Sequence, residues 1–200
     1  GLSVTGLVNQ KDVKKNNGTQ CGDVLILTKP LGVGLTLNAL RMDDCSKEMQ
    51  EKVFKSMTTL NKYACDILKK YDVHALTDVT GFGLLVHLNE MLDETNSAII
   101  YKDSIPYFDD CRKYVEEFYL SGAAQTNRNS VEGKIRFDCD FFTEEILFDP
   151  QTSGGLLASV SKDDLADIQK DFMENNLELY VVGEVIEKNE YNVYVRGRKI

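Results

Sequence analysis

The sequence has little positive charge and no stripe of Lys and Arg interleaved with aromatic residues. It holds 23 Lys and Arg against 32 Asp and Glu, which gives a net charge of −9 at pH 7. Binding to the phosphate backbone of nucleic acid depends on a basic surface, which an acidic chain lacks. The composition therefore argues against nucleic acid as a partner, although a nucleotide can still bind at a local site.

Long hydrophobic runs are also missing. No apolar segment approaches the roughly 20 residues that a membrane-spanning helix needs. The N-terminal stretch GLSVTGLV has neither the basic flank nor the cleavable apolar core of a signal peptide. We therefore expect a cytoplasmic protein with no membrane partner. The sequence also begins without Met, which indicates either a domain cut from a longer chain or a trimmed start.

Paired cysteine motifs are absent as well. The chain has five cysteines, an odd number at wide spacings with no C-x-x-C: Cys21, Cys45, Cys65, Cys111 and Cys139. Neither a zinc site nor a disulfide framework fits this pattern. We expect reduced thiols without a catalytic role.

Hydrophobic patterning predicts a mixture of strands and helices in a single domain, residues 1–200. Hydrophobic residues make up 42% of the chain and charged residues 28%, as in an ordinary globular protein. The patterns predict strands at residues 2–8, 22–30, 73–78, 97–102, 156–160, 177–188 and 191–197, the last two joined by a turn around Asn189. They predict helices within residues 31–42, 46–70, 82–92, 107–119 and 162–174, and a polar loop at 121–133. Without strict alternation of the two, the expected fold is α+β: a layered α/β sandwich with a mixed sheet flanked by helices.

The stretch ALTDVTGFGLLVH, residues 75–87, carries the first candidate site. Asp78 lies between Thr77 and Thr80, and Gly81 and Gly83 follow at the start of a predicted helix. Free N–H groups at a helix N-terminus favour anions, so Asp78 can simply cap the helix. Alternatively, Asp78 binds a hard cation such as Mg²⁺ while the glycines let phosphate oxygens approach the backbone. The residues alone leave both interpretations open.

A second candidate is DPQTSGGLL, residues 149–157. Gly154 and Gly155 lead into a predicted strand and no Lys follows them, so this is not a P-loop. Asp149 followed by proline favours a tight turn, and Thr152, Ser153 and the glycines can form a nest of N–H groups that holds an anion. An ordinary turn is the alternative.

The remaining polar candidates are one arginine and two histidines. Arg128 in the segment GAAQTNRN either clamps an anion or is solvated. His74 and His87 are interpreted as structural residues. None of these features identifies a site when it is taken alone.

Five segments occur together, in the order GLSVTGLV, GDVLILTKPLGVG, ALTDVTGFGLLVH, GAAQTNRN and DPQTSGGLL. In this order they resemble the C-terminal half of the selenophosphate synthetase (selenide, water dikinase) family, over essentially the whole chain. The most specific pieces are TDVTGFG and DPQTSGG. That family belongs to the AIR-synthase-like (PurM-like) ATP-dependent enzymes, in which an N-terminal domain helps form a dimeric barrel and a C-terminal domain is an α/β sandwich. The resemblance implies that this chain is the second domain.

The resemblance also implies an activity. Such enzymes convert ATP, selenide and water to selenophosphate, AMP and phosphate with Mg²⁺, and the full-length protein is expected to be a homodimer. Asp78 matches a magnesium-binding aspartate of the family. Residues implied to line the phosphate cleft are Thr77, Thr80, Gly81, Gly83, Arg128, Asp149, Thr152, Ser153, Gly154 and Gly155. The family's Cys or selenocysteine nucleophile, its essential lysine and its other metal-binding aspartates lie upstream, so we expect this chain to hold no catalytic residue and to be inactive alone.

One position departs from the family pattern, because Val86 stands where the family usually has Gly. A side chain is favourable in a helix body, so we expect a local packing adjustment there. Two other functions stay open: another enzyme of the superfamily, such as an aminoimidazole ribotide synthetase or a thiamine monophosphate kinase, and a non-catalytic regulatory or scaffold homologue.

Overall fold

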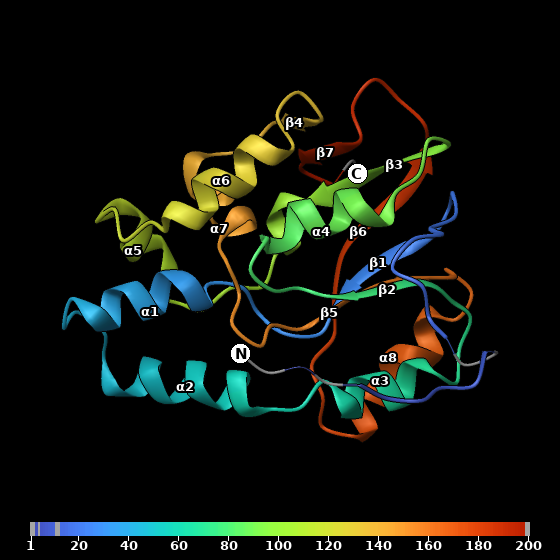
Figure 1. Cartoon of the computed structure of the whole chain (residues 1–200), viewed down its shortest axis with the longest axis horizontal. Coiled ribbons are helices and arrows are strands. Elements are labelled where there is room, and N and C mark those ends of the chain that lie inside the picture. The colour runs from blue at the N-terminus through green and yellow to red at the C-terminus, as the bar shows by residue number, and fades with distance from the viewer. Residues whose placement is uncertain (1–2, 4, 11–12, 199–200) are drawn as a thin grey trace.

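A mixed β-sheet forms the centre of the molecule (Figure 1). The structure is a computed structural model that describes residues 3, 5–10 and 13–198. Within those residues the sheet has seven strands in the order β2-β5-β1-β6-β3-β7-β4. Their bounds are Val24–Leu27 (β1), Val73–Asp78 (β2), Asn96–Tyr101 (β3), Ile135–Phe137 (β4), Leu156–Val160 (β5), Tyr180–Glu187 (β6) and Val193–Arg196 (β7). Strand β7 runs parallel to β3 and β4, and the other neighbours are antiparallel, which confirms the predicted mixed sheet.

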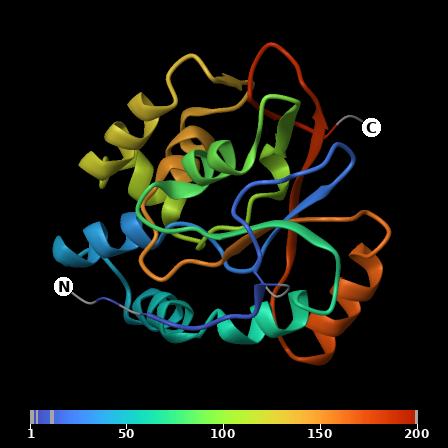
Figure 2. The same ribbon diagram turned by 45° about the vertical axis from the view of Figure 1, so that its right-hand side comes forward.

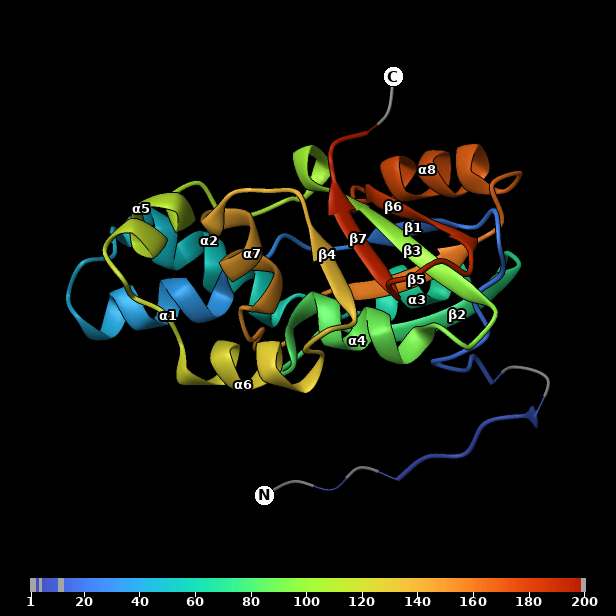
Figure 3. The same ribbon diagram turned by 90° about the horizontal axis from the view of Figure 1, so that it is seen from above.

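Helices cover both faces of the sheet. Their bounds are Val33–Arg41 (α1), Lys47–Thr58 (α2), Lys62–Leu68 (α3), Gly83–Met91 (α4), Cys111–Glu116 (α5), Gly122–Ser130 (α6), Phe141–Phe148 (α7) and Leu165–Glu174 (α8), with a 3₁₀ turn at Lys102–Ser104 (η2). Viewed from above, α8 and α4 lie on opposite sides of the strands (Figure 3). The teal α3 and the orange α8 lie side by side (Figure 2). The predicted α+β sandwich is confirmed.

Strand β1 shows how the sequence produces this layering. Its residues read VLIL and all four are buried, as expected of a strand covered on both faces. Because side chains alternate across a strand, Val24 and Ile26 pack in the cluster that includes α3 and α8. Leu25 and Leu27 pack in the larger cluster with α1, α4 and α7. The core is therefore divided by the sheet into two unequal halves.

The predicted helix at residues 46–70 is wrong as a single element, because it is broken between α2 and α3. Ser46 caps α2 as predicted, and its Oγ accepts the Met49 N–H at 3.1 Å. Thr59 then leaves the helix with φ −71° and ψ 121°. Its carbonyl oxygen accepts a bond from the Lys29 ammonium at 2.8 Å, a tertiary contact that hydrophobic periodicity does not reveal.

Other predictions need correction near residues 121–148. The predicted loop at 121–133 contains α6, whose first N–H groups are capped by Ser121, with its Oγ 3.1 Å from the Ala123 nitrogen. Neither β4 nor α7 was predicted. The predicted helix at 107–119 is confined to Cys111–Glu116, and the one at 162–174 begins at Leu165.

The two ends of the chain also differ from expectation. Among residues 2–8, positions 3 and 5–8 form no strand, and the rest of that prediction lies outside the described residues. Both C-terminal strands exist, but β3 lies between them in the sheet. Further along the N-terminal segment, the Lys15 carbonyl accepts the Leu76 N–H at 2.8 Å, so this segment covers the free edge of β2. In the described part of the chain, no helix is long and apolar enough to cross a membrane.

Candidate functional site

The segments TDVTGFG and DPQTSGG lie side by side, although some seventy residues separate them in the chain. Strands β2 and β5 pair antiparallel, which places Asp78 opposite Leu156. Beyond the paired strands, the Val79 N–H donates to the Gly155 carbonyl at 2.8 Å, and the Gln151 N–H donates to the Thr80 carbonyl at 3.0 Å. The two motifs therefore form one continuous surface at the end of the sheet.

Asp78 is the last residue of β2, and its side chain is free. The residue is exposed, and no hydrogen bond or ion pair engages its carboxylate within the part of the chain that the structure describes. Helix α4 begins at Gly83, five positions later, and no side chain caps it. The interpretation of Asp78 as a helix cap is therefore wrong. An exposed carboxylate beside two turns is instead available to a ligand.

Thr80 holds the turn after Asp78 in place. Its carbonyl accepts N–H groups from Gly83 and Gln151, both at 3.0 Å. Its hydroxyl lies 3.3 Å from the Nε2 atom of His87, a residue that is buried in α4. The other ring nitrogen of His87, Nδ1, lies 3.3 Å from a Glu90 carboxylate oxygen without hydrogen-bonding to it. His87 thus contacts the turn through the Thr80 hydroxyl, and its structural role stays a prediction.

Two glycines of the site are required by close backbone contacts. Gly83 has φ +71°, and a Cβ there would lie 2.8 Å from the Phe148 carbonyl. A Cβ on Gly154 would overlap the Val79 carbonyl oxygen. In contrast, nothing lies within 4 Å of the position that a Cβ on Gly81 would take. Gly81 therefore borders open space in the turn that follows Asp78, whereas Gly83 and Gly154 allow the segments to pack.

Helix α6 joins the same assembly through Asn127. The Asn127 amide donates to the Gly81 carbonyl at 2.9 Å and to the Phe148 carbonyl at 3.1 Å. One side chain thus connects the GAAQTNRN segment to the TDVTGFG turn and to the residue before DPQTSGG. The neighbour of Arg128, not Arg128 itself, makes the direct link to the site.

Arg128 is not a free cation. Its two terminal nitrogens lie 2.6 Å from a Glu144 oxygen and 2.5 Å from a Glu145 oxygen, and its guanidinium lies 4.8 Å from the centre of the Phe148 ring. These contacts brace α6 against α7. The guanidinium that was a candidate anion clamp is thus occupied by two carboxylates.

Asp149 lies inside the domain and not on its surface. It is 1% exposed, and burial raises the pKa of its carboxyl to about 7. Its Oδ2 accepts the Gly34 N–H and the Gln151 amide, each at 2.9 Å. Gln151 in turn accepts the Val33 N–H at 3.2 Å. The predicted cleft residue Asp149 therefore contacts the first turn of α1 in this chain.

The TSGG segment, residues 152–155, is only partly at the surface. Thr152 and Ser153 are exposed, whereas Gly154 and Gly155 are buried. The Ser153 carbonyl accepts a bond from the Lys29 ammonium at 2.9 Å, and the Gly154 carbonyl accepts one from the Asn61 amide at 2.9 Å. Neither donor was predicted, because both reach the turn across long stretches of sequence.

The described residues contain no group of three or more His, Cys, Asp or Glu side chains that could hold a metal. Among the described residues, Asp78 therefore belongs to no such group. Comparison with known proteins gives a family for the arrangement: residues 20–196 match the model described as AIR synthase related protein, C-terminal domain.

The chain belongs to the AIR synthase related family. Its similar curated relatives include proteins named selenide, water dikinase. The relative from Agathobacter rectalis is 44% identical over 197 residues, and the one from Desulfitobacterium hafniense is 40% identical over 194 residues. These alignments cover 98% and 96% of this chain, but only 58% and 57% of the relatives. This chain thus spans little more than half the length of the relatives that it matches.

Solved structures show the same fold at much lower sequence identity. Thiamine-monophosphate kinase from Stenotrophomonas maltophilia superposes with a TM-score of 0.67 at 16% identity, covering 96% of this chain and 56% of that one. The hydrogenase maturation protein HypE from E. coli gives a TM-score of 0.63 at 16% identity, covering 92% and 49%. At this identity the likeness establishes the AIR-synthase-type fold and nothing further.

Proposed function

We propose that this chain is the C-terminal part of a selenide, water dikinase, an enzyme that converts ATP, selenide and water to selenophosphate, AMP and phosphate. The free carboxylate of Asp78, at the junction of TDVTGFG and DPQTSGG, is the observation that carries the proposal. The relatives with that name, at 40–44% identity over nearly the whole chain, support the same reaction.

The donor set fits a magnesium ion that is shared with another part of the protein. Magnesium in phosphate-transfer sites usually takes one or two carboxylates, and phosphate oxygens and water complete its shell. Asp78 offers one carboxylate, and Gly81, three residues later, borders open space. When bound, the metal neutralises charge on the phosphates of ATP. Thr80 and Asn127 contribute indirectly, because they fix the backbone on which Asp78 and Gly81 are placed.

The remaining parts of the site belong to the N-terminal part of the longer protein. The relatives are longer than this chain, and the reaction needs a nucleophile and further metal ligands that the described residues do not group together. We infer that the upstream domain supplies them and that the full-length enzyme is a homodimer. The isolated chain is then inactive, because half of its site is absent.

Nucleotide binding by the fold family is consistent with this proposal. A structure of AaThiL complexed with AMPPCP and TMP shares the fold, with a TM-score of 0.57 at 18% identity. Thiamine-monophosphate kinases are thus fold relatives, but their 16–18% identity is far below that of the selenide, water dikinases. The difference favours the selenide-dependent reaction over the thiamine-phosphate reaction.

A substitution of Asp78 in the full-length protein tests the proposal. We expect Asp78→Asn to lower selenide-dependent formation of AMP from ATP by about 100-fold or more, since it removes a charged metal ligand from a phosphoryl-transfer site. The matched control is Asp163→Asn, an exposed aspartate just before α8 whose carboxylate has no partner within the described residues. Rates near wild type for Asp78→Asn, or an equal loss in both variants, contradict the metal role.

A further inference from the structure

Lys29 is a buried cation directly beneath the DPQTSGG turn. It follows β1 and is 7% exposed, and its ammonium donates to the carbonyls of Thr59 at 2.8 Å and Ser153 at 2.9 Å. No carboxylate pairs with it within the described residues. Burial of a charge without a counter-ion costs free energy, and here it lowers the pKa of the lysine. A neutral side chain at this position would avoid the cost. We therefore ask what the positive charge of Lys29 contributes.

Asn61 repeats the same contact one residue further along the turn. It stands at the start of α3, and its amide donates to the Gly154 carbonyl at 2.9 Å. Two consecutive carbonyls, of Ser153 and Gly154, are therefore held, one by Lys29 after β1 and the other by Asn61 at the break between α2 and α3. In a trans peptide the carbonyl and the following N–H point in opposite directions. The N–H groups of Gly154 and Gly155 must then point away from Lys29 and Asn61.

Gly154 and Gly155 are buried, so their N–H groups each need a hydrogen-bond acceptor. Neither donates to an acceptor within the described residues. The residue before them, Ser153, has φ +53°, a left-handed conformation that is unfavourable for a side chain other than glycine. Such conformations persist where neighbouring contacts enforce them, and they concentrate at functional sites. Lys29 supplies one of the enforcing contacts at Ser153 itself.

The charge of Lys29 also acts through the peptide groups. An ammonium bound to a carbonyl oxygen polarises that peptide, which makes its N–H a better donor to an anion. Successive N–H groups that face one way form a known type of phosphate-binding nest. We propose that Lys29, together with Asn61, is a positioning residue of the phosphate site: it fixes the Ser153–Gly155 turn so that the N–H groups of Gly154 and Gly155 receive a phosphate of ATP. This inference rests on the proposed function.

A second lysine nearby provides a matched control. Lys29 and Lys55 both line a cavity of about 620 Å³ between α2, α3 and residues 176–180. The ammonium of Lys55 makes no hydrogen bond or ion pair with the described residues, and so none with the turn. Replacing Lys55 therefore removes the same charge from the same cavity without releasing the Ser153 carbonyl.

The test compares Lys29→Met, Lys55→Met and Asn61→Ala in the full-length enzyme, with circular dichroism to confirm folding. We expect Lys29→Met to raise the KM for ATP by about tenfold, the effect of losing one charge-assisted contact. The KM for selenide stays unchanged, Lys55→Met behaves as wild type, and Asn61→Ala shifts the KM for ATP in the same direction by less. In the wild type, the KM for ATP also rises at alkaline pH as Lys29 loses its proton, and this rise is absent in Lys29→Met. A merely structural lysine gives no such difference.

Two results overturn the inference. One is a KM for ATP in folded Lys29→Met that matches that of Lys55→Met. If Lys29→Met does not fold, the other is an unchanged KM in Asn61→Ala. Asp78→Asn separates this failure from failure of the proposed function: if Asp78→Asn loses activity while Lys29→Met does not, the dikinase assignment stands and only the role of Lys29 falls. If Asp78→Asn keeps full activity, the proposed function itself is wrong.

Discussion

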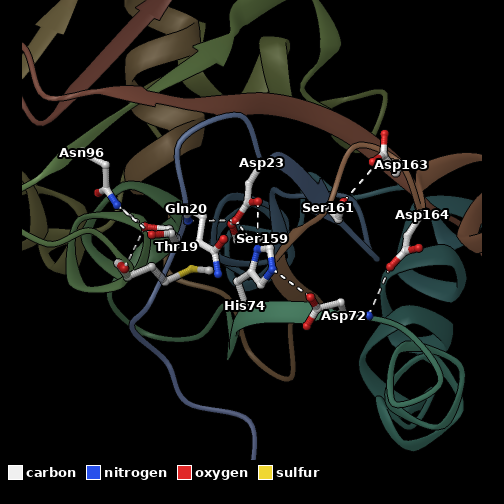
Figure 4. Close-up of polar contacts among 11 residues, drawn as sticks. Thr19, Gln20, Asp23, Asp72, His74, Asn96, Ser159, Ser161, Asp163 and Asp164 are labelled. Atoms are coloured by element: carbon white, nitrogen blue, oxygen red, sulfur yellow. Dashed lines mark hydrogen bonds and ion pairs between the residues drawn. The ribbon is translucent and has the colours of Figure 1, made fainter.

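The two ends of strand β2 differ in how their carboxylates are engaged. At its beginning, His74 lies in a network with Asp23 and Ser159 that crosses the three adjacent strands β2, β5 and β1 (Figure 4). The His74 Nδ1 atom is 2.8 Å from an Asp23 oxygen, and the Ser159 hydroxyl donates to the other Asp23 oxygen at 2.5 Å. At the end of the same strand, Asp78 has no partner within the described residues. The Asp23 carboxylate is thus hydrogen-bonded inside the domain, whereas the Asp78 carboxylate can bind a ligand from outside it.

Burial and charge explain why the first end is structural. Asp23 is 3% exposed, and it also accepts the Gln20 N–H at 2.9 Å. Burial acts to lower the pKa of His74, but the carboxylates of Asp23 and Asp72 outweigh it and raise the pKa. A hydroxyl that donates to a buried carboxylate is poorly placed to act as a nucleophile, and Ser159 is fully buried. The network therefore resembles a catalytic arrangement only in its residue types.

The comparison is tested most strongly by removing each carboxylate from the isolated chain. We expect Asp23→Ala to destabilise the fold by about 3 kcal/mol, because it leaves His74, Ser159 and a backbone N–H without their acceptor. Asp78→Ala should change the free energy of unfolding by no more than about 0.5 kcal/mol. Urea denaturation measures both. Equal losses in the two variants would show that Asp78 is as structural as Asp23.

Two glycines sharpen the same contrast at the site itself. Gly154→Ala should cost about 2 kcal/mol, since the added methyl group overlaps the Val79 carbonyl oxygen and the segments must separate. Gly81→Ala adds the same group to open space and should cost less than about 0.5 kcal/mol. Thermal or urea unfolding of the isolated chain compares them. A Gly81→Ala variant as unstable as Gly154→Ala would mean that the space at Gly81 is not open.

The buried carboxyl of Asp149 gives an effect on stability that depends on pH. Its pKa is raised from 3.8 to about 7 in the folded chain, so the folded state keeps this proton longer than the unfolded state does. Its contribution to stability is therefore complete below about pH 4 and is lost as the pH rises to about 7, by at most about 1.4 kcal/mol per pH unit. Asp149→Asn should remove this loss. The difference in unfolding free energy between wild type and Asp149→Asn, measured from pH 4 to 8, should change up to pH 7 and then level off; a flat difference contradicts it.

Much of the fold was predictable because it rests on local pattern. The continuous apolar run VLIL predicts a strand covered on both faces, and the Leu-rich segment after Gly83 predicts α4. Helix α6 was missed because its buried positions are small or polar, Ala124 and Asn127, and give no apolar stripe. The break in residues 46–70 was missed because a contact from Lys29, some thirty residues earlier in the chain, holds it.

The candidate site was predictable only in part. Local sequence left Asp78 open to two interpretations, and its resemblance to a family, not its spacing, favoured the metal. The same resemblance assigned Arg128 and Asp149 to the cleft. In this chain, Arg128 is instead paired with two glutamates of α7, and Asp149 accepts a hydrogen bond from the first turn of α1. Lys29 and Asn127 were missed because their donors meet carbonyl groups far away in the sequence. Every residue has a backbone carbonyl, so the sequence does not show which carbonyl a donor side chain will contact.

The most direct test of Asp78 is a metal titration of the full-length protein. Mn²⁺ replaces Mg²⁺ as a paramagnetic probe, and its electron paramagnetic resonance signal reports free and bound metal in the presence of a non-hydrolysable ATP analogue. We predict that Asp78→Asn weakens Mn²⁺ binding by about tenfold or more, the effect of losing a charged ligand, while Asp163→Asn binds as wild type. Wild-type Mn²⁺ affinity in Asp78→Asn would contradict the claim that this free carboxylate belongs to a metal site shared with the upstream domain.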